Sequence, residues 1–272
     1  MTHLADFNGT LVLVGAGKMG SAMLDGWLGL GLAAAKIAVM EPQPAPAVTA
    51  LTKRGITLNP ASVRGAAVVV LAVKPQVAPL VLPGLAALID RSTVVVSIMA
   101  GRALDFLDER LGGGMPIVRA MPNTPAAIGR GITVAVPNTR VSAAQRDLVG
   151  RLLSATGAVE WVTDEALMDA VTAVSGSGPA YVFLLAECLA RAGAAAGLPE
   201  GLATRLARAT VAGSGELLHR SDLDAATLRQ NVTSPGGTTA AALDVLMGKN
   251  GLAPLMEKAI AAATKRSREL AG

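Results

Sequence analysis

The stretch TLVLVGAGKMG, from Thr10 to Gly20, decides the fold of this chain. Four apolar residues run directly into glycines with the spacing G-x-G-x-x-G, and apolar residues then recur at helical intervals. A strand that turns on glycines into a helix aims free backbone N–H groups at one point, at the positive end of the helix dipole. In this pattern Gly15 permits the tight turn, Gly17 lets a pyrophosphate come close, and Gly20 lets helix and strand pack together.

The stretch therefore predicts a dinucleotide-binding turn. An ordinary glycine-rich turn is the alternative, because the chain contains 30 glycines and chance matches occur. The apolar run before the glycines and the helical pattern after them are the context that the motif requires, and both are present.

Composition predicts a soluble cytoplasmic protein with a large core. Of 272 residues, 51% are hydrophobic and only 2% are aromatic, so Ala, Leu and Val must build that core. No uninterrupted apolar run approaches the ~18 residues of a membrane span, and the N-terminus lacks the pattern of a signal peptide. The single cysteine excludes an internal disulfide and fits a reducing compartment.

The net charge of +4 raises the possibility of nucleic-acid binding. The basic residues are scattered, however, and few aromatic side chains exist to stack on bases, so we expect no nucleic-acid partner. A small cluster at Lys265, Arg266 and Arg268 ends a helical pattern, where cations complement the helix dipole.

The first part of the chain alternates strand and helix patterns. Strand-like runs occupy residues 37–40, 56–58, 66–73, 93–97, 116–121, 131–136 and 158–162. This alternation predicts an α/β fold over residues 1–164: a Rossmann-like, doubly wound and mostly parallel sheet. Ligands of such sheets lie beyond the carboxyl ends of the strands, so the turns at 15–20, 72–75, 98–100 and 121–123 are expected to share one crevice.

From Asp164 onward only helical spacing appears, which predicts an all-helical domain over residues 165–272. Residues 180–196 are apolar almost all round, with Glu187 and Arg191 as the only charges. A helix without a polar face needs cover on every side, and a small helical domain can hardly supply it. We therefore expect a large subunit interface here.

The chain has few side chains that could act as a metal ligand, a nucleophile or a strong acid or base. With only His3 and His219, no His-rich metal site can be assembled, and no metal is expected. Cys188 lies within an apolar helical run, where a packed thiol is expected rather than a nucleophile. This shortage of reactive side chains fits hydride transfer, in which the cofactor carries the reactive atom.

Glu41 follows a predicted strand and lies 21 residues after Gly20. In dinucleotide-binding folds an acidic residue near this position binds the ribose hydroxyls. The alternative is a surface Glu at the start of a Pro-rich loop.

Two further loops could hold a ligand. In residues 233–239, TSPGGTT, a Pro-Gly-Gly turn opens a helix at Thr238 and Thr239, which would present N–H donors and hydroxyls to a carboxylate. A plain helix cap by Thr238 or Ser234 is the alternative. Residues 175–181, SGSGPAY, are a third candidate, with a simple loop before a helix as the alternative.

Together these motifs resemble the pyrroline-5-carboxylate reductases. GAGKMG, AVKPQ at 72–76, MPNTP at 121–125, SGSGPAY at 175–181 and NVTSPGGTT at 231–239 occur in the family's order and spacing over essentially the whole chain. The resemblance implies reduction of the C=N bond of 1-pyrroline-5-carboxylate to L-proline by NADPH or NADH, the last step of proline biosynthesis. It also implies a homodimer formed through the helical domain, and in some members a pentamer of dimers.

Site residues follow from the resemblance, position by position. Ser234, Gly237, Thr238 and Thr239 would hold the substrate carboxylate, with Ser234 and Thr239 as the catalytic positions and Thr239 approaching the ring nitrogen. With Glu41 and its neighbour Pro42, the expected cofactor-binding residues are Gly15, Ala16, Gly17, Lys18, Met19, Gly20, Asn59, Ala72, Val73, Lys74, Pro75, Ile98, Met99, Ala100, Asn123 and Asn231.

The chain departs from the family at Glu41-Pro42, where many members carry small or basic groups and favour NADPH. A carboxylate there would repel a 2′-phosphate, so use of NADH is a possibility. Two alternatives remain open: a reductase of another imine or of a β-hydroxyacid, and a non-catalytic nucleotide-binding protein. The β-hydroxyacid reductases place a catalytic Lys on a helix of the second domain, and here Lys249, Lys258 and Lys265 all come late.

Overall fold

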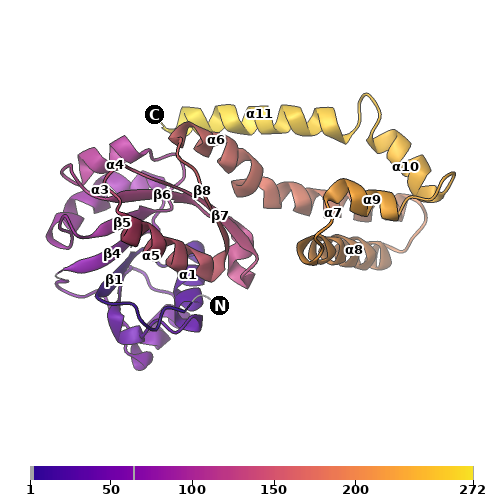
Figure 1. Cartoon of the computed structure of the whole chain (residues 1–272). Helices are drawn as coiled ribbons and strands as arrows, with labels where there is room; N and C mark the ends of the chain where they lie inside the picture. The colour runs from indigo at the N-terminus through magenta and orange to yellow at the C-terminus, as the bar shows by residue number, and fades with distance from the viewer. Residues whose placement is uncertain (1–2, 64, 272) are drawn as a thin grey trace. The chain divides into compact units, whose positions relative to one another are not determined.

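The computed structural model describes residues 3–63 and 65–271. These residues divide into two compact units (Figure 1). The first, the sheet unit, comprises Met1–Gly176 together with Thr264–Gly272. The second, the helical unit, comprises Ser177–Ala263.

The sheet unit contains a single eight-stranded sheet within the described residues, in the order β3-β2-β1-β4-β5-β6-β7-β8. Its strands are β1 (Thr10–Val14), β2 (Ile37–Met40), β3 (Thr57–Leu58), β4 (Ala66–Leu71), β5 (Val94–Ser97), β6 (Ile117–Met121), β7 (Gly131–Pro137) and β8 (Gly157–Trp161). The first six strands run parallel, β7 is antiparallel to β6, and β8 is parallel to β7. The order 3-2-1-4-5-6 is that of a doubly wound dinucleotide-binding sheet, so the predicted Rossmann-like fold is confirmed.

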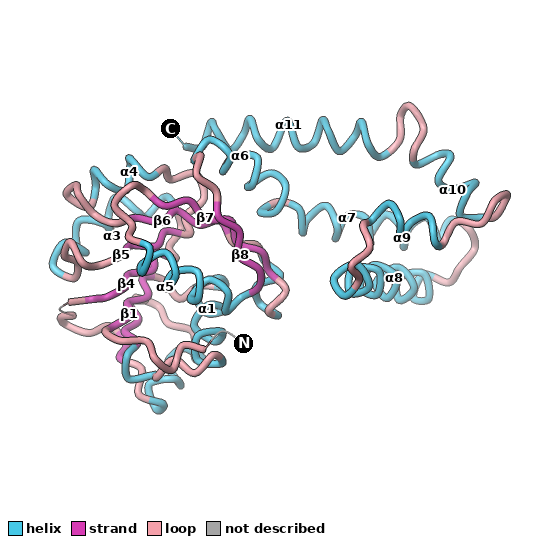
Figure 2. Tube along the Cα trace, viewed as in Figure 1, coloured by secondary structure: helices cyan, strands magenta, loops and turns pink. Residues whose placement is uncertain are grey.

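Helices cover both faces of this sheet (Figure 2). They are α1 (Lys18–Gly29), α2 (Pro46–Ala50), α3 (Ala78–Val81), α4 (Leu104–Arg110), α5 (Ala143–Leu153) and α6 (Met168–Val171). One face packs against α1 and α5 around Trp27, whose indole Nε1 donates to the carbonyl of Leu152 at 2.9 Å. The other packs against the segment of Leu82 and Leu85 and against Leu107 of α4. Burial on both faces explains why the strands read as continuous apolar runs.

Helix ends follow the signals in the sequence. Ser142 caps α5 with a complete capping box, since its hydroxyl accepts from Gln145 N–H and the Gln145 side chain accepts from Ser142 N–H. Gly31 adopts a positive φ just after α1, and its N–H donates to Leu28 O.

The helical unit holds α7 (Gly178–Ala195), α8 (Glu200–Arg220), α9 (Ala225–Asn231), α10 (Thr238–Leu246) and most of α11 (Leu252–Ala271). Helices α7 and α8 pack against each other. The end of α11 belongs to the sheet unit, where the Ser267 hydroxyl donates to Asp169 Oδ1 at 2.6 Å. The all-helical character predicted from residue 165 onward is confirmed.

The predicted domain boundary at residue 164 falls ahead of the division between the compact units. Residues 165–176 pack with the sheet, because Met168 is 1% exposed among Val134 and Val136 of β7. Arg119 of β6 also forms an ion pair with Glu165 at 2.7 Å.

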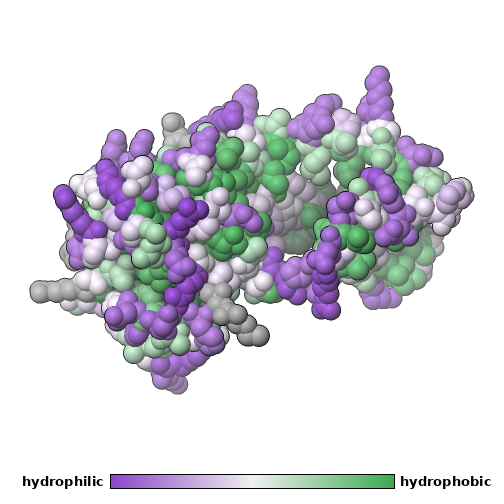
Figure 3. Space-filling model, in the orientation of Figure 1, coloured by the Kyte–Doolittle hydropathy of each residue, from purple (hydrophilic) through white to green (hydrophobic). Residues whose placement is uncertain are grey.

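Helix α7 has no buried residue in the single chain. Its exposed large apolar side chains are Val182, Phe183, Leu184, Leu185 and Leu189. Hydrophobic surface, green in Figure 3, lies over the helical unit. By length and composition alone, the helical stretch Glu165–Ala195 could also cross a membrane. A single stretch of this kind is weak evidence for a membrane protein. The expected lack of internal cover for α7 is confirmed.

Candidate active site

The glycine turn between β1 and α1 fits a pyrophosphate. Gly15 has φ +93°, and a Cβ there would lie 2.7 Å from the Ala72 carbonyl oxygen. A Cβ on Gly20 would lie 2.3 Å from the carbonyl oxygen of Gly15. A Cβ on Gly17 would meet no atom of the chain within 4 Å. Two of the glycines are therefore needed for internal packing, whereas Gly17 faces open space that a ligand can fill.

The N-terminus of α1 supplies the donors at this turn. Gly17 is the N-cap and receives no side-chain capping bond. Its carbonyl accepts the N–H of Ser21 at 2.8 Å, so the N–H groups of Lys18, Met19 and Gly20 precede the helical ladder. With the helix dipole they form a site of positive potential suited to a phosphate anion.

Two neighbouring turns lie at the same edge of the sheet. Ala72 N–H donates to Val14 O at 2.8 Å, and Ile98 N–H donates to Leu71 O at 3.0 Å, so the turns after β1, β4 and β5 are adjacent. Arg102 links the last two, because its Nη2 donates to Pro75 O at 3.3 Å. The structure thus brings together the residues predicted at 15–20, 72–75 and 98–100.

The side chains in these turns differ in accessibility. Lys18 and Lys74 are exposed, whereas Met99 is 2% exposed and packs in the core. Met99 can therefore offer a ligand only its main chain. Arg102 was missed by sequence reasoning, since nothing in the sequence marks a link between residues of two turns.

Asn123 follows β6 and begins the 3₁₀ turn η5 (Thr124–Ile128). Its side-chain Oδ1 accepts the N–H of Ile132 at 2.9 Å, and η5 packs against α1. The amide oxygen of Asn123 thus holds the turn, and its NH₂ group is the part left to serve a ligand.

Glu41, just past β2, bonds to the glycine turn itself. Its carboxylate Oε2 accepts the backbone N–H of Ala16 at 2.9 Å, and Oε1 accepts the N–H of Gln43 at 3.1 Å. The Asn59 side chain in turn bonds both main-chain groups of Glu41. Pro42 is exposed beside it. Glu41 therefore lies at the predicted edge, but its bond to Ala16 could not be read from the sequence.

The loop at 233–239 belongs to the helical unit. Gly236 has φ +68°, Gly237 N–H donates to Ser234 O at 3.0 Å, and α10 begins at Thr238. Gly237 is the N-cap and receives no side-chain capping bond. The alternative in which Thr238 or Ser234 caps the helix is therefore wrong. Ser234 and Thr238 are exposed and Thr239 is half-buried, and the N–H groups of Thr238 and Thr239 precede the helical ladder of α10.

Two other features differ from expectation. Ser175 and Gly176, the first residues of the candidate loop 175–181, lie in a π-helical turn (Thr172–Gly176), and a Cβ on Gly176 would lie 2.5 Å from Met121 Cε. Cys188 is exposed in the single chain rather than packed, because the surface of α7 is uncovered there.

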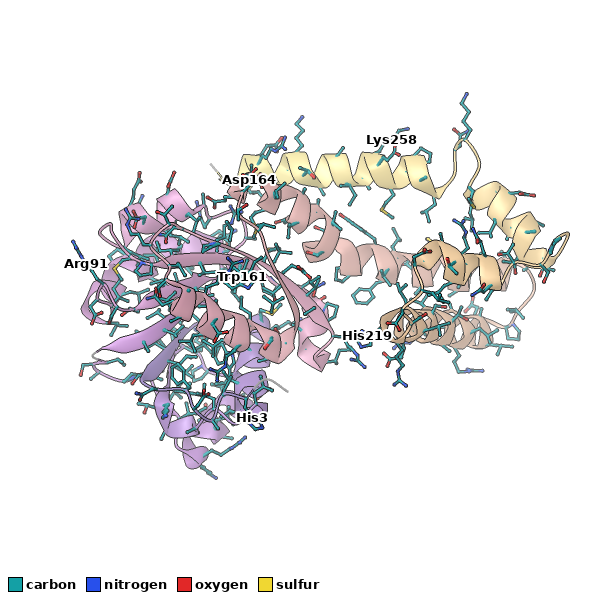
Figure 4. The ribbon with its side chains drawn as sticks, in the orientation of Figure 1. His3, Arg91, Trp161, Asp164, His219 and Lys258 are labelled. Atoms are coloured by element: carbon teal, nitrogen blue, oxygen red, sulfur yellow. The ribbon has the colours of Figure 1, made fainter. Side chains whose placement is uncertain are left out.

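Asn231, the last residue of α9, is exposed in the helical unit. His3 and His219 come from the N-terminal segment and from α8 (Figure 4). Among the described residues, no group of three or more His, Cys, Asp or Glu side chains could hold a metal ion.

Comparison with known families agrees with this geometry. Residues 165–270 match the family profile described as pyrroline-5-carboxylate reductase dimerisation. Residues 10–101 match the profile described as NADP oxidoreductase coenzyme F420-dependent. A pyrroline-5-carboxylate reductase of Pseudomonas aeruginosa is 42% identical over 264 residues, covering 96% of each chain. This chain belongs to the pyrroline-5-carboxylate reductase family.

Other members of the family resemble it over the same length. The pyrroline-5-carboxylate reductase of Pisum sativum is 38% identical and covers 96% of each chain. The structure of the pyrroline-5-carboxylate reductase from Coxiella burnetii matches with a TM-score of 0.89 at 34% identity, covering 97% of this chain and 99% of that one. The Plasmodium falciparum pyrroline carboxylate reductase, solved with NADP bound, matches with a TM-score of 0.82 at 31% identity, with the same coverage.

Membership in a pyrroline-5-carboxylate reductase family makes this protein an NAD(P)-binding oxidoreductase. It also identifies the helical region as the family's dimerisation region. The resemblance drawn from the five motifs is thereby confirmed.

Proposed function

We propose that this protein reduces the C=N bond of 1-pyrroline-5-carboxylate to give L-proline, the last step of proline biosynthesis. The observation that carries the proposal is the 42% identity to a pyrroline-5-carboxylate reductase over 96% of both chains. The glycine turn and the uncapped N-terminus of α10 support it, since they offer one anion site for a cofactor and one for a substrate.

The cofactor, when bound, supplies a hydride from its reduced nicotinamide ring. The sheet unit binds and orients it. Backbone N–H groups at the start of α1 take the pyrophosphate, and Gly17 leaves the space for it. The turns at 72–75 and 98–100 and Asn123, beyond the ends of β4, β5 and β6, line the remainder.

The helical unit binds the substrate through the loop before α10. The carboxylate of 1-pyrroline-5-carboxylate accepts from the N–H groups of Thr238 and Thr239 and from the Ser234 hydroxyl, while Gly237, whose own N–H donates to Ser234 O, shapes the turn that presents them. The Thr239 hydroxyl approaches the ring nitrogen. A protonated imine is electrophilic and becomes neutral as hydride arrives, so an oriented hydroxyl and a fixed carboxylate suffice without a strong acid. Asn231, just before this loop, would serve the nicotinamide side of the cofactor. Much of the rate comes from holding the two reacting carbons in contact.

Glu41 sets the cofactor preference toward NADH. Its carboxylate lies on the glycine turn, where an adenosine 2′-hydroxyl can donate to it and a 2′-phosphate would be repelled.

The protein functions as a homodimer through its helical unit, with a pentamer of dimers as the larger assembly. The exposed apolar side chains of α7 support this, because they need cover that the single chain lacks. The same need accounts for the apolar stretch Glu165–Ala195 without a membrane. We place the protein in the cytoplasm, without a nucleic-acid partner.

The decisive experiment follows NADH or NADPH absorbance with 1-pyrroline-5-carboxylate, with a β-hydroxyacid partner and with no substrate. Oxidation of the cofactor with the imine alone, giving L-proline, supports the proposal. Turnover only with the hydroxyacid pair, or cofactor binding without any turnover, would replace it by one of the two alternatives.

A further inference from the structure

One amide side chain bonds both main-chain groups of the residue that follows β2. Glu41 N–H donates to Asn59 Oδ1 at 2.8 Å, and Asn59 Nδ2 donates to the Glu41 carbonyl oxygen at 2.9 Å. A partner strand would offer the same donor and acceptor pair. The Asn59 side chain thus continues the β2–β3 pairing by one residue beyond the end of the ladder.

The backbone at Asn59 requires this residue type. Asn59 follows β3 directly, its N–H donates to Val39 O at 2.7 Å, and its φ is +47°. Among the described residues it is the only non-glycine with a positive φ. Asn tolerates this left-handed conformation better than most side chains, and glycine tolerates it fully.

The carboxylate of Glu41 continues the connection to the glycine turn. Oε2 accepts the N–H of Ala16, the residue between Gly15 and Gly17, at 2.9 Å. The N–H of Gly15 donates to Met40 O at 2.9 Å, which brings the end of β2 against the same turn. Hydrogen bonds therefore run without a gap from Asn59 through Glu41 to Ala16.

We infer that Asn59 is a positioning residue for cofactor choice: by clamping the main chain of Glu41 it fixes the carboxylate that discriminates NADH from NADPH. The inference rests on the preference proposed for Glu41. A carboxylate discriminates against a 2′-phosphate only while it is held in place, because a free Glu side chain can rotate away from a like charge. Four hydrogen bonds hold Glu41: two join its main chain to Asn59, and two join its carboxylate to the N–H groups of Ala16 and Gln43. Losing Asn59 therefore frees the main chain from which the carboxylate reaches the glycine turn.

The chain offers a well-matched set of variants. Asn59→Gly keeps the left-handed backbone and removes only the amide. Asn59→Asp keeps the acceptor for Glu41 N–H but places an oxygen against the Glu41 carbonyl. Asn138→Ala is the control, because Asn138 makes a similar clamp, to Ile117 N–H and Met115 O, at the opposite, amino end of β6.

The first measurement is the dissociation constant of NADH and of NADPH, obtained by titrating each purified variant without substrate. The ratio of the two affinities is expected to move toward NADPH by about fivefold in Asn59→Gly, and by no further amount when Glu41→Gln is already present, because the two residues act as one unit. Asn138→Ala is expected to leave the ratio unchanged.

The second measurement needs no cofactor. Backbone amide exchange at Ala16 reports the bond to Glu41 Oε2, so Asn59→Gly is expected to accelerate it and Asn138→Ala is not. A merely structural role for Asn59 would weaken both cofactors equally and leave the Ala16 amide protected.

The outcomes distinguish the role inferred for Asn59 from the cofactor preference proposed for Glu41. If Glu41→Gln shifts the affinity ratio and Asn59→Gly does not, the inference is overturned and the role of Glu41 stands. If neither variant shifts the ratio, both are overturned. A shift in Asn59→Gly that persists in full when Glu41→Gln is present also overturns the inference, because Asn59 would then act on the cofactor without Glu41.

Discussion

Arg119 Nη1 lies 2.7 Å from Glu165 Oε1, and the same oxygen accepts the backbone N–H of Leu104 at 2.9 Å. One carboxylate therefore joins the middle of β6, the start of α4 and the turn that precedes α6. The Arg119 side chain is 7% exposed and that of Glu165 is 29% exposed. The pair fastens the segment 165–176 to the sheet.

We expect Glu165→Ala to lower the free energy of unfolding by about 2–3 kcal/mol, because the buried guanidinium of Arg119 and the N–H of Leu104 lose their acceptor. The loss is smaller than that for a fully buried ion pair because Glu165 is partly exposed. Urea denaturation at fixed protein concentration measures this. Glu165→Gln is the matched variant, since its amide oxygen can still accept both bonds, and it is expected to lose less. Equal losses in the two variants would contradict a role for the accepted hydrogen bonds.

In the proposed mechanism the hydroxyl of Thr239 approaches the imine nitrogen. Thr239→Ala is expected to lower kcat/KM by about one to three decades, the scale of losing one oriented donor. Thr239→Ser keeps the hydroxyl and is expected to retain most of the activity. Steady-state rates with 1-pyrroline-5-carboxylate provide the comparison, and full activity in the alanine variant would remove Thr239 from the mechanism.

Gly17 and Gly20 allow a test of the two roles of glycine in the turn. Alanine at Gly20 would bring a methyl group within 2.3 Å of the Gly15 carbonyl oxygen, so Gly20→Ala is expected to lower the Tm strongly. Gly17 has an ordinary φ of −68° and open space at its Cβ position. Gly17→Ala is therefore expected to keep its Tm within a few degrees while the dissociation constant of NADH rises at least about tenfold, equivalent to 1.4 kcal/mol.

Thermal unfolding and cofactor titration of both variants separate the roles. Unchanged affinity in a folded Gly17→Ala protein would show that no pyrophosphate approaches this glycine. A Gly20→Ala protein as stable as the parent would contradict the close packing of α1 on its own turn.

Phe183 is 66% exposed on α7, so it suits a test of the subunit interface. A charge at this position is expected to shift the protein from dimer to monomer, because an unpaired carboxylate would be buried against the partner. The variant is Phe183→Glu, and Leu80→Glu is its control, since Leu80 is 83% exposed in the sheet unit. Light scattering after size exclusion measures the mass. An unchanged mass for Phe183→Glu would place the interface elsewhere.

Local patterns in the sequence predicted most of the fold. Hydrophobic runs predicted the strands, and glycine spacing predicted the turn before α1, because each pattern depends on residues close together in the chain. The hydrogen bonds and ion pairs between residues distant in the chain were not predictable in this way. Arg119 and Glu165 are 46 residues apart, and Ala16 and Glu41 are 25 apart, so only the packed sheet brings each pair together.

Residues 172–176 show that local sequence preference can also mislead. Ser175 and Gly176 open the segment 175–181, for which a simple loop before a helix was one of the two sequence interpretations, since both residues favour turns. In the structure the helical path from α6 continues through them as a π turn, with Gly176 against Met121. Tertiary packing overrode local preference there, next to a motif that the family shares.

The bond from Ala16 N–H to Glu41 Oε2 leads to the remaining prediction, on cofactor choice. Glu41→Ser removes the negative charge and leaves a hydroxyl that can donate to a phosphate, so the ratio of kcat/KM for NADH to that for NADPH is expected to fall by about tenfold or more. The change should come mainly through KM, because the proposal assigns Glu41 to the adenosine end of the cofactor, away from the hydride. Raising the salt concentration should reduce the discrimination in the parent protein and have less effect on Glu41→Ser, since repulsion between charges at an exposed edge is screened. Rates with both cofactors at two ionic strengths measure all of this. An unchanged NADH to NADPH ratio in Glu41→Ser would leave the carboxylate only the task of holding the glycine turn.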